Sequence, residues 1–220
     1  MKTVLVVGAS RGLGLEFVRQ YAAAGWRVLA GLRHPASTEL PAAVTSYAID
    51  VCKLASIEAV LEALQHELDH LVVCAGALGP RNQAFETPDP EEFDQVMRTN
   101  VLGPIALIEQ FAPHIRPGGC IAVLTSRMGS IGDAESPFAL LYRCSKAAAN
   151  MAVRCAAKAC AGGGPRIVAL HPGWVRTEMG GPDAPLLPPE SVTGMRRVID
   201  DAEAFPSGGF YNYLGETVPW

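Results

Sequence analysis

The chain has no long apolar segment. No run approaches the roughly 20 apolar residues that a membrane-spanning helix needs. The apolar stretch from Val4 to Val7 near the amino end is too short for a secretory signal, and the charged residue Arg11 comes soon after it. We therefore expect a soluble protein that is located in the cytoplasm and does not enter a membrane.

Basic residues are sparse and do not cluster. The sequence holds 18 lysines and arginines against 22 aspartates and glutamates, which gives a net charge of -4. Without a stripe of positive charge, the chain lacks the basic surface patch that binds a nucleic-acid backbone or an anionic membrane surface. We expect neither as a partner.

The cysteines follow no metal-binding or disulfide pattern. They are Cys52, Cys74, Cys120, Cys144, Cys155 and Cys160. Their spacing lacks the close pairs of zinc sites, and their density is below that of a disulfide scaffold. Because cysteine is among the most often buried residue types, we expect reduced, mostly buried thiols and no bound metal.

Hydrophobic residues are abundant, at 49% of the 220 residues, whereas charged residues make up 18%. This composition suits a sheet that is buried on both faces. Strand-like apolar runs span residues 3–7, 27–31, 44–49, 70–74, 120–125, 166–170 and 209–213, separated by segments with helical periodicity. The alternation predicts an α/β fold: a single domain over residues 1–220, with a doubly wound parallel sheet of about seven strands and helices on both faces.

The helical segments are bounded by glycine and proline. We expect helices over residues 12–24, 54–68, 91–115 and 141–161, the third of them bent near Gly103-Pro104. The connection over residues 33–43 is too short for a full helix, so that crossover is expected to be abbreviated. Residues 172–189 are irregular and rich in glycine and proline, which is typical of a mobile lid over a substrate.

A glycine-rich turn follows the first strand and opens the first helix. It reads Gly8-Ala9-Ser10-Arg11-Gly12-Leu13-Gly14. In an α/β sheet such a turn brings backbone N–H groups and a helix N-terminus against a pyrophosphate. We predict a dinucleotide here, although glycine clusters also serve simply as turns.

The same turn also matches the G-x-S-x-G nucleophile elbow of hydrolases, with Ser10 as nucleophile. This alternative needs an oxyanion hole from an earlier strand–helix loop, but no strand precedes this one. It also needs a late histidine, and His171 would have to serve as the base. A serine hydrolase is therefore the weaker alternative.

The second strand ends without an acidic residue to hold a ribose 2′-hydroxyl. Arg33 stands there instead, and Arg11 lies in the glycine turn. Guanidinium groups suit a 2′-phosphate, so NADP is favoured over NAD. The alternative is that both arginines are simply solvated surface charges.

Tyr142, Lys146 and Ser126 form the most informative constellation of the chain. Tyrosine and lysine four residues apart lie on one helix face. A free phenol has a pKa of about 10, and a cation about 4 Å away is worth around 4 kcal/mol at an effective dielectric of about 20. We therefore predict that Lys146 lowers the pKa of Tyr142, and that Ser126 shares a hydrogen bond to the substrate oxygen. The same spacing also occurs by chance on many helices, but here that helix follows the fifth strand.

With these residues, the chain resembles the short-chain dehydrogenase/reductase family over essentially its whole length. The family's glycine motif falls on Gly8, Gly12 and Gly14, and its adenine-contacting aspartate falls on Asp50, with Val51 next. Its Ala-Gly pair falls on Ala75 and Gly76, and its asparagine falls on Asn100. Its serine, tyrosine and lysine fall on Ser126, Tyr142 and Lys146. Its nicotinamide-contacting segment falls on Pro172 and Gly173, with Val175 and Thr177 beyond. The segments 129–131, 171–177 and 215–220 look like the carbonyl reductase branch that includes C-factor and sniffer-type proteins.

The resemblance implies a Rossmann-type fold and hydride transfer between NADP(H) and a carbonyl or alcohol carbon. It implies that Tyr142 is the general acid and base, that Lys146 lowers its pKa and holds the nicotinamide ribose, that Ser126 orients the carbonyl, and that Asn100 maintains a water-linked proton path. The glycine-turn residues Ser10, Arg11 and Leu13 and the arginine Arg33 complete the expected cofactor contacts. Two departures stand out: Val73-Cys74 replace two asparagines, and the interval from Ser126 to Tyr142 is longer than usual.

Apolar residues are expected around the carbonyl, which favours a small hydrophobic aldehyde or ketone. The candidates are Met128, Phe138, Trp174 and Met179, with Leu140, Leu186 and Leu187 nearby; any of them could instead be a packing residue. A second hypothesis is a dinucleotide-bound signalling or regulatory protein with little turnover. The alanine-rich helix over residues 147–157 could pack against a second copy in a homodimer, or within one chain.

Overall fold

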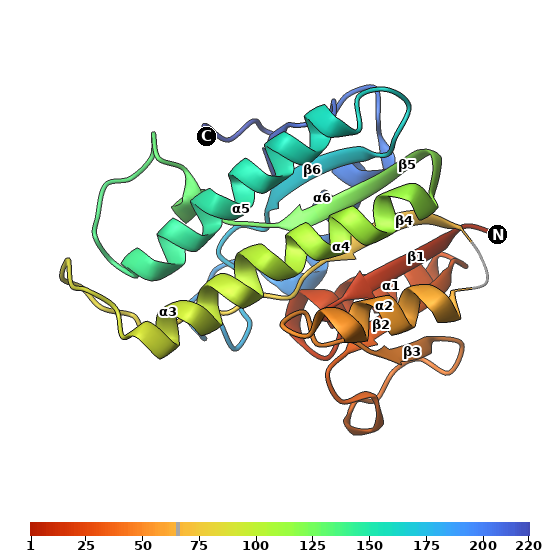
Figure 1. Ribbon diagram of the computed structural model, residues 1–220, viewed down its shortest axis with the longest axis horizontal. Helices are drawn as coiled ribbons and strands as arrows, with labels where there is room; N and C mark the ends of the chain where they lie inside the picture. Colours follow the sequence, from red (N-terminus) through yellow and green to blue (C-terminus); the bar gives the residue numbers. More distant parts are fainter. Residues whose placement is uncertain (65–66) are drawn as a thin grey trace.

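The computed structural model describes residues 1–64 and 67–220, and these form layers around a seven-stranded sheet (Figure 1). The strands are β1 (Thr3–Val7), β2 (Arg27–Leu32), β3 (Thr45–Ala48), β4 (Leu68–Val73), β5 (Ile115–Leu124), β6 (Arg166–His171) and β7 (Phe210–Asn212). Their order is β3-β2-β1-β4-β5-β6-β7, and each neighbouring pair runs parallel. The predicted doubly wound parallel sheet is confirmed.

Helices cover both faces of the sheet. They are α1 (Gly12–Ala23), α2 (Leu54–Ala63), α3 (Pro90–Met97), α4 (Gly103–Phe111), α5 (Leu140–Ala159) and α6 (Pro188–Asp200). The helices α2, α4 and α5 pack against one face, whereas α1 and α6 pack against the other (Figure 1). Only a single 3₁₀ turn, Pro35–Ser37, links β2 to β3, as the short connection predicted.

Two apolar cores lie on opposite sides of the sheet because successive strand residues point to opposite faces. Leu5, Leu71 and Ile121 belong to the core beneath α2, α4 and α5. Val6 and Val72 belong to the core beneath α1 and α6. All five residues are completely buried, which accounts for the continuous apolar runs in the sequence.

The direction of winding reverses between β1 and β4. From β1 the chain builds outward through β2 and β3, then returns to place β4 on the other side of β1. In open α/β sheets, ligands bind at the carboxyl ends of the strands at such a reversal. The residues that follow β1 and β4 are therefore the expected walls of a binding crevice.

The predicted helix over residues 54–68 is too long. Helix α2 ends at Ala63, and Leu68 already belongs to β4, where it pairs with Ile115 of β5. Leu68 is completely buried in the sheet, so tertiary pairing overrides the helical spacing of its apolar neighbours. The part of the prediction at residues 65–66 lies outside the described residues.

The predicted helix over residues 91–115 also ends too late. Its carboxyl end is a 3₁₀ turn at Ala112–His114, and Ile115 begins the long strand β5. Its predicted bend near Gly103-Pro104 is a wide π-helical turn, Arg98–Leu102, between α3 and α4. Pro104 has no N–H to donate to the preceding turn, which favours such a widening.

The helices expected from the sequence do not include α6. It begins at Pro188, inside the predicted lid over residues 172–189. Its signals were present: two prolines at the first helical positions, Glu190 in the first turn, and buried Val192, Met195 and Val198 at helical spacing. The glycine- and proline-rich composition before it masked this start.

Within the two described ranges, the structure contains no helix with the length and apolarity to cross a membrane.

Candidate active site

In the glycine turn, backbone atoms pack directly against the backbone of neighbouring segments. Gly8 has a φ of +85°, and a Cβ atom built there would lie 2.5 Å from the backbone nitrogen of Ala75. A Cβ atom on Gly14 would lie 2.1 Å from the carbonyl oxygen of Gly8. Side chains at these positions would push the start of α1 away from the ends of β1 and β4, so the turn requires glycine.

The amino end of α1 is suited to an anion. Arg11 occupies the position before the helix, and among the described residues no side chain caps this end or places an acid in its first turn. The first backbone N–H groups of a helix need acceptors from outside, and the helix dipole favours negative charge there. The pyrophosphate of a dinucleotide matches both requirements.

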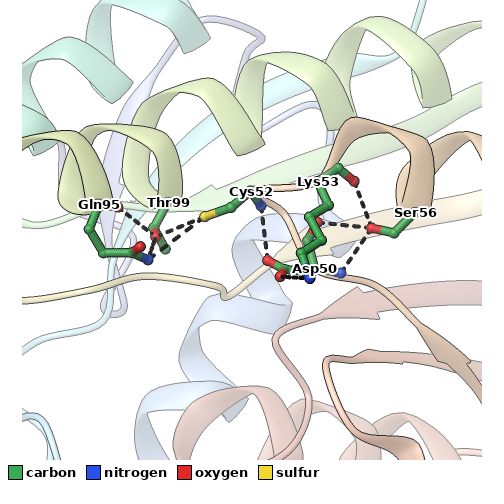
Figure 2. A network of polar contacts seen from close by, with 6 residues as sticks. All are labelled: Asp50, Cys52, Lys53, Ser56, Gln95 and Thr99. Atoms are coloured by element: carbon green, nitrogen blue, oxygen red, sulfur yellow. Dashed lines mark hydrogen bonds and ion pairs between the residues drawn. The ribbon is translucent and has the colours of Figure 1, made fainter. Parts of the chain in front are cut away.

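Asp50 is held rigidly where the resemblance places the adenine. Its Oδ1 accepts a hydrogen bond of 3.1 Å from the backbone N–H of Cys52, and its Oδ2 lies 3.7 Å from Lys53 Nζ. The Asp50 backbone N–H donates to Ser56 Oγ at 3.0 Å (Figure 2). The carboxylate keeps 28% exposure, so it remains accessible to a ligand.

A second set of polar contacts joins this loop to the helix that carries Asn100. Cys52 Sγ lies 3.3 Å from Thr99 Oγ1, and Gln95 Nε2 donates to the same Thr99 oxygen at 3.2 Å (Figure 2). Thr99 is part of the π-helical turn. The loop of Asp50 and the π-helical turn of Asn100 are therefore joined by direct side-chain contacts.

Asn100 ties three segments together. Its Oδ1 accepts a hydrogen bond of 2.8 Å from the backbone N–H of Ala77, and its Nδ2 donates to the Ala77 carbonyl at 2.7 Å and to Ser145 Oγ at 2.8 Å. Ser145 Oγ in turn donates to the Tyr142 carbonyl at 2.8 Å. The Asn100 side chain, 1% exposed, thus fixes the loop after β4 against the helix of Tyr142.

Lys146 is buried at the carboxyl ends of the central strands. Its Nζ donates to the Leu124 carbonyl at 3.0 Å and lies 5.6 Å from the centre of the Tyr142 ring. A Cβ atom built on Gly76 would lie 3.6 Å from Nζ, so the lysine lies beside the Ala75-Gly76 segment that follows β4. Burial lowers the pKa of Lys146 to about 8.

The phenol of Tyr142 is less acidic than the sequence predicted. Burial raises its pKa to about 12, and the Ser126 hydroxyl, which interacts with the phenol, opposes this rise. The prediction that Lys146 makes the phenol unusually acidic is wrong for this arrangement, because desolvation outweighs any charge effect on the buried ring. Ser126 Oγ also accepts from the Met128 N–H at 3.1 Å.

The segment after β6 reaches back toward the glycine turn. Gly173 has a φ of +83°, and the carbonyl of the preceding Pro172 accepts a hydrogen bond of 2.6 Å from Ser191 Oγ of α6. Val175 is buried, and a Cβ atom built on Gly12 would lie 3.5 Å from Thr177 Cγ2. The two predicted cofactor-binding segments therefore meet across the crevice.

Sequence comparison identifies the family. The profile of the short chain dehydrogenase family matches residues 2–185. The chain belongs to the short-chain dehydrogenase/reductase family. It is therefore an NAD(P)-dependent oxidoreductase that acts on a small molecule, and it is similar to carbonyl reductases.

Individual members of the short-chain dehydrogenase/reductase family are similar over most of their length. C-signal of Myxococcus xanthus is 45% identical over 134 residues, which cover 60% of this chain and 81% of that protein. A short-chain dehydrogenase/reductase of Burkholderia multivorans, solved with bound NADP, is 34% identical with a TM-score of 0.92, over 100% of this chain and 99% of that one. A carbonyl reductase of Pseudomonas aeruginosa in complex with NADP is 33% identical with a TM-score of 0.89, over the whole of both chains.

Membership of this family leaves the serine hydrolase without support. Ser10 follows β1, whereas His171 ends β6, and two strands lie between. At about 4.8 Å per strand spacing, the separation is on the order of 14 Å, far beyond a hydrogen bond. Burial, with a smaller contribution from the Arg127 guanidinium, lowers the pKa of His171 to about 4, which makes it a weak base.

The departure from the short-chain dehydrogenase/reductase pattern at Cys74 places a neutral group near the lysine. Burial raises the pKa of the Cys74 thiol well above its ordinary value, and the Lys146 charge only partly opposes this. The thiol therefore stays protonated at neutral pH. It packs against the core beneath α1 and α6.

The predicted substrate-pocket residues differ in exposure. Met128 and Phe138 are partly buried, whereas Trp174 and Met179 are 58% and 40% exposed. The Trp174 indole donates to the Gly180 carbonyl at 2.8 Å. Their contact with a substrate remains a prediction.

Two groups at the site were not recognised in the sequence. The Leu124 carbonyl anchors Lys146, and Ser145 connects Asn100 to the backbone of Tyr142. Ser145 could have been found, because it directly precedes Lys146 on the same helix. No sequence pattern marks a backbone carbonyl such as that of Leu124.

Proposed function

We propose that this oxidoreductase transfers hydride between NADP(H) and the carbonyl or alcohol carbon of a small hydrophobic substrate. The observation that carries the proposal is the convergence of Ser126, Tyr142 and Lys146 near the carboxyl ends of β4 and β5, beside the crevice expected from the sheet topology. Ser126 interacts with the phenol, and Lys146 lies 5.6 Å from its ring. In this proposal, these groups contact the substrate oxygen and the nicotinamide ribose, as the family resemblance implies.

In carbonyl reduction, Tyr142 donates a proton to the substrate oxygen. A phenol with a pKa of about 12 remains protonated at neutral pH and is ready to act as an acid. Ser126 donates a second hydrogen bond to the same oxygen and stabilises its developing charge. NADPH, when bound, supplies the hydride.

Lys146 and Asn100 hold the site in position. With a pKa of about 8, Lys146 is mostly protonated at neutral pH and can donate to a nicotinamide ribose hydroxyl. Asn100 fixes the loop of Ala77 against α5 through its amide. A water-linked path through Asn100 completes the proton supply in this proposal.

Arg11 and Arg33 support NADP over NAD. Both side chains are exposed near the amino end of α1 and the carboxyl end of β2, where the 2′-phosphate is expected. Two similar proteins of known structure contain NADP. Guanidinium groups bind phosphate in a bidentate manner, which NAD does not offer at this position.

The direct test compares the wild-type protein with Tyr142→Phe. We expect NADPH-dependent reduction of hydrophobic aldehydes and ketones, followed at the nicotinamide absorbance band, to fall about 10² to 10⁴-fold. Cofactor binding should be retained, because the phenyl ring preserves the packing. Full activity in the variant would contradict the assigned role of Tyr142.

A signalling role is the second candidate, because the chain is 45% identical to C-signal over 134 residues. In that case the dinucleotide would serve structure or regulation with little turnover. Absence of turnover with a broad panel of carbonyl compounds, despite tight NADPH binding, would favour it. The homodimer and the single domain over residues 1–220 remain predictions.

A further inference from the structure

Arg11 of the glycine turn has a partner of opposite charge. Its Nη1 lies 2.7 Å from Oε2 of Glu178, which lies in the segment after β6. Both side chains are largely exposed, at 68% and 72%. The guanidinium proposed to bind the 2′-phosphate is thus engaged by a carboxylate of the same chain.

The loop that carries Glu178 is an ordered structure. The Arg176 N–H donates to the Leu186 carbonyl at 2.8 Å, and the Gly180 N–H donates to Thr177 Oγ1 at 3.1 Å. A small internal turn therefore holds Glu178 near Arg11.

The same loop is anchored on its far side. Arg81, from the segment after β4, donates through Nη2 to the Met179 carbonyl at 2.7 Å. Residues 177–179 thus lie between two segments of the chain. Thr177 and Glu178 lie beside the glycine turn, and Met179 contacts the segment after β4. The Arg11–Glu178 ion pair is the charged contact on the side of the glycine turn.

We propose that Glu178 is a specificity-determining residue that competes with the 2′-phosphate of NADP for the Arg11 guanidinium. The inference rests on the proposed binding of NADP by Arg11. NADPH must displace the carboxylate or bind beside it against charge repulsion. NADH has no 2′-phosphate and leaves the pair intact, so Glu178 reduces the preference for NADPH.

The expected size follows from the exposure of the pair. Exposed ion pairs contribute little, so freeing Arg11 should change the affinity for a 2′-phosphate by about two- to fivefold. Salt should reduce the effect, because exposed charges are screened beyond about 3 Å at 1 M ionic strength. A change of this size is measurable by direct titration.

The experiment measures dissociation constants of NADPH, NADH, adenosine 2′,5′-bisphosphate (2′,5′-ADP) and 5′-AMP by calorimetry or fluorescence. The variants are Glu178→Gln, the control Asp183→Asn, Arg11→Gln, and the double variant Arg11→Gln/Glu178→Gln. Asp183 is an exposed carboxylate of the same segment, so its change removes the same charge. 2′,5′-ADP and 5′-AMP differ only by the 2′-phosphate, so this pair tests the 2′-phosphate without nicotinamide or turnover.

We expect Glu178→Gln to tighten the binding of NADPH and 2′,5′-ADP about two- to fivefold and to leave the binding of NADH and 5′-AMP unchanged. Asp183→Asn should not alter the ratio, and Glu178→Gln should have no further effect once Arg11 is replaced. Equal shifts for phosphorylated and unphosphorylated ligands, no shift, or a shift that persists without Arg11 would each overturn the inference.

The Arg11→Gln variant separates the two proposals. If it weakens NADPH while Glu178→Gln changes nothing, the competition is wrong and the NADP assignment stands. If it alters none of the four ligands, Arg11 does not bind the 2′-phosphate and the competition is wrong, whereas the preference for NADP would then depend on Arg33 alone.

Discussion

At the scale of single residues, burial sets the charge state of the site. It raises the pKa of Tyr142 to about 12 and lowers the pKa of Lys146 to about 8. Both shifts favour the neutral form, as desolvation requires. At pH 7 the phenol is therefore protonated and the amine still mostly charged, which is the combination needed to donate a proton in carbonyl reduction.

These shifts predict a decline of reduction at alkaline pH. As the pH rises through about 8, Lys146 loses its proton and its charge, whereas Tyr142, with a pKa of about 12, stays protonated. The rate of carbonyl reduction should thus be level below about pH 7 and fall between pH 8 and 10. Measuring kcat from pH 6 to 10.5 checks this expectation.

The variant Lys146→Arg provides the comparison for that profile. A guanidinium remains charged throughout this range, so any residual activity should decline at a higher pH than in the wild type. A wild-type profile that stays level to pH 10 would show that the charge of Lys146 is not what limits reduction.

At the scale of elements, the π-helical turn between α3 and α4 brings Asn100 to the centre of the site. We expect Asn100→Ala to lower the free energy of unfolding by about 2 to 3 kcal/mol, because the backbone groups of Ala77 and the hydroxyl of Ser145 lose a buried partner. Urea denaturation measures the change. The control is Asn82→Ala, an exposed asparagine bonded to Glu86 at 3.2 Å, for which less than about 0.5 kcal/mol is expected. Equal effects would contradict the bridging role of Asn100.

The junction of β1 and α1 offers a second test at this scale. We expect Gly14→Ala to destabilise the protein by about 1 to 3 kcal/mol and to weaken cofactor binding, because the new methyl group would collide with the Gly8 carbonyl. Gly162→Ala is the matched control, since a Cβ atom built there meets nothing within 4 Å. Thermal unfolding and NADPH titration of both variants check the expectation. A stable Gly14→Ala protein with normal affinity would rule out the close packing.

The sequence predicted the elements better than their ends. Buried strands such as β1 and β6 were recognisable because both faces are apolar. Leu68 was assigned to a helix, because only its pairing with Ile115 reveals it as part of a strand. The Tyr142–Lys146 pair was recognisable from spacing, whereas the direction of the Tyr142 pKa shift depends on burial, which spacing does not report.

At the scale of the whole molecule, the ligand-binding crevice is expected where the two halves of the sheet meet. The order β3-β2-β1 forms one half and β4-β5-β6-β7 the other. The glycine turn and Arg11 belong to the first half, and Ser126, Tyr142 and Lys146 belong to the second. A ligand that spans the crevice therefore contacts both halves and should stabilise the native state as a whole.

Thermal stability in the presence of cofactor tests this arrangement. At 100 times its dissociation constant, NADPH should add about 2.7 kcal/mol and raise the Tm by about 5 to 10 °C. Because the net charge of -4 does not attract an anion, binding must depend on local donors: the backbone of α1 and the exposed arginines Arg11 and Arg33. Contacts of exposed arginines are screened by salt, whereas those of the backbone amides are screened less. The Tm shift produced by a fixed concentration of NADPH should therefore decrease with added NaCl more steeply than the shift produced by NADH, and parallel decreases would show that neither arginine contacts the 2′-phosphate.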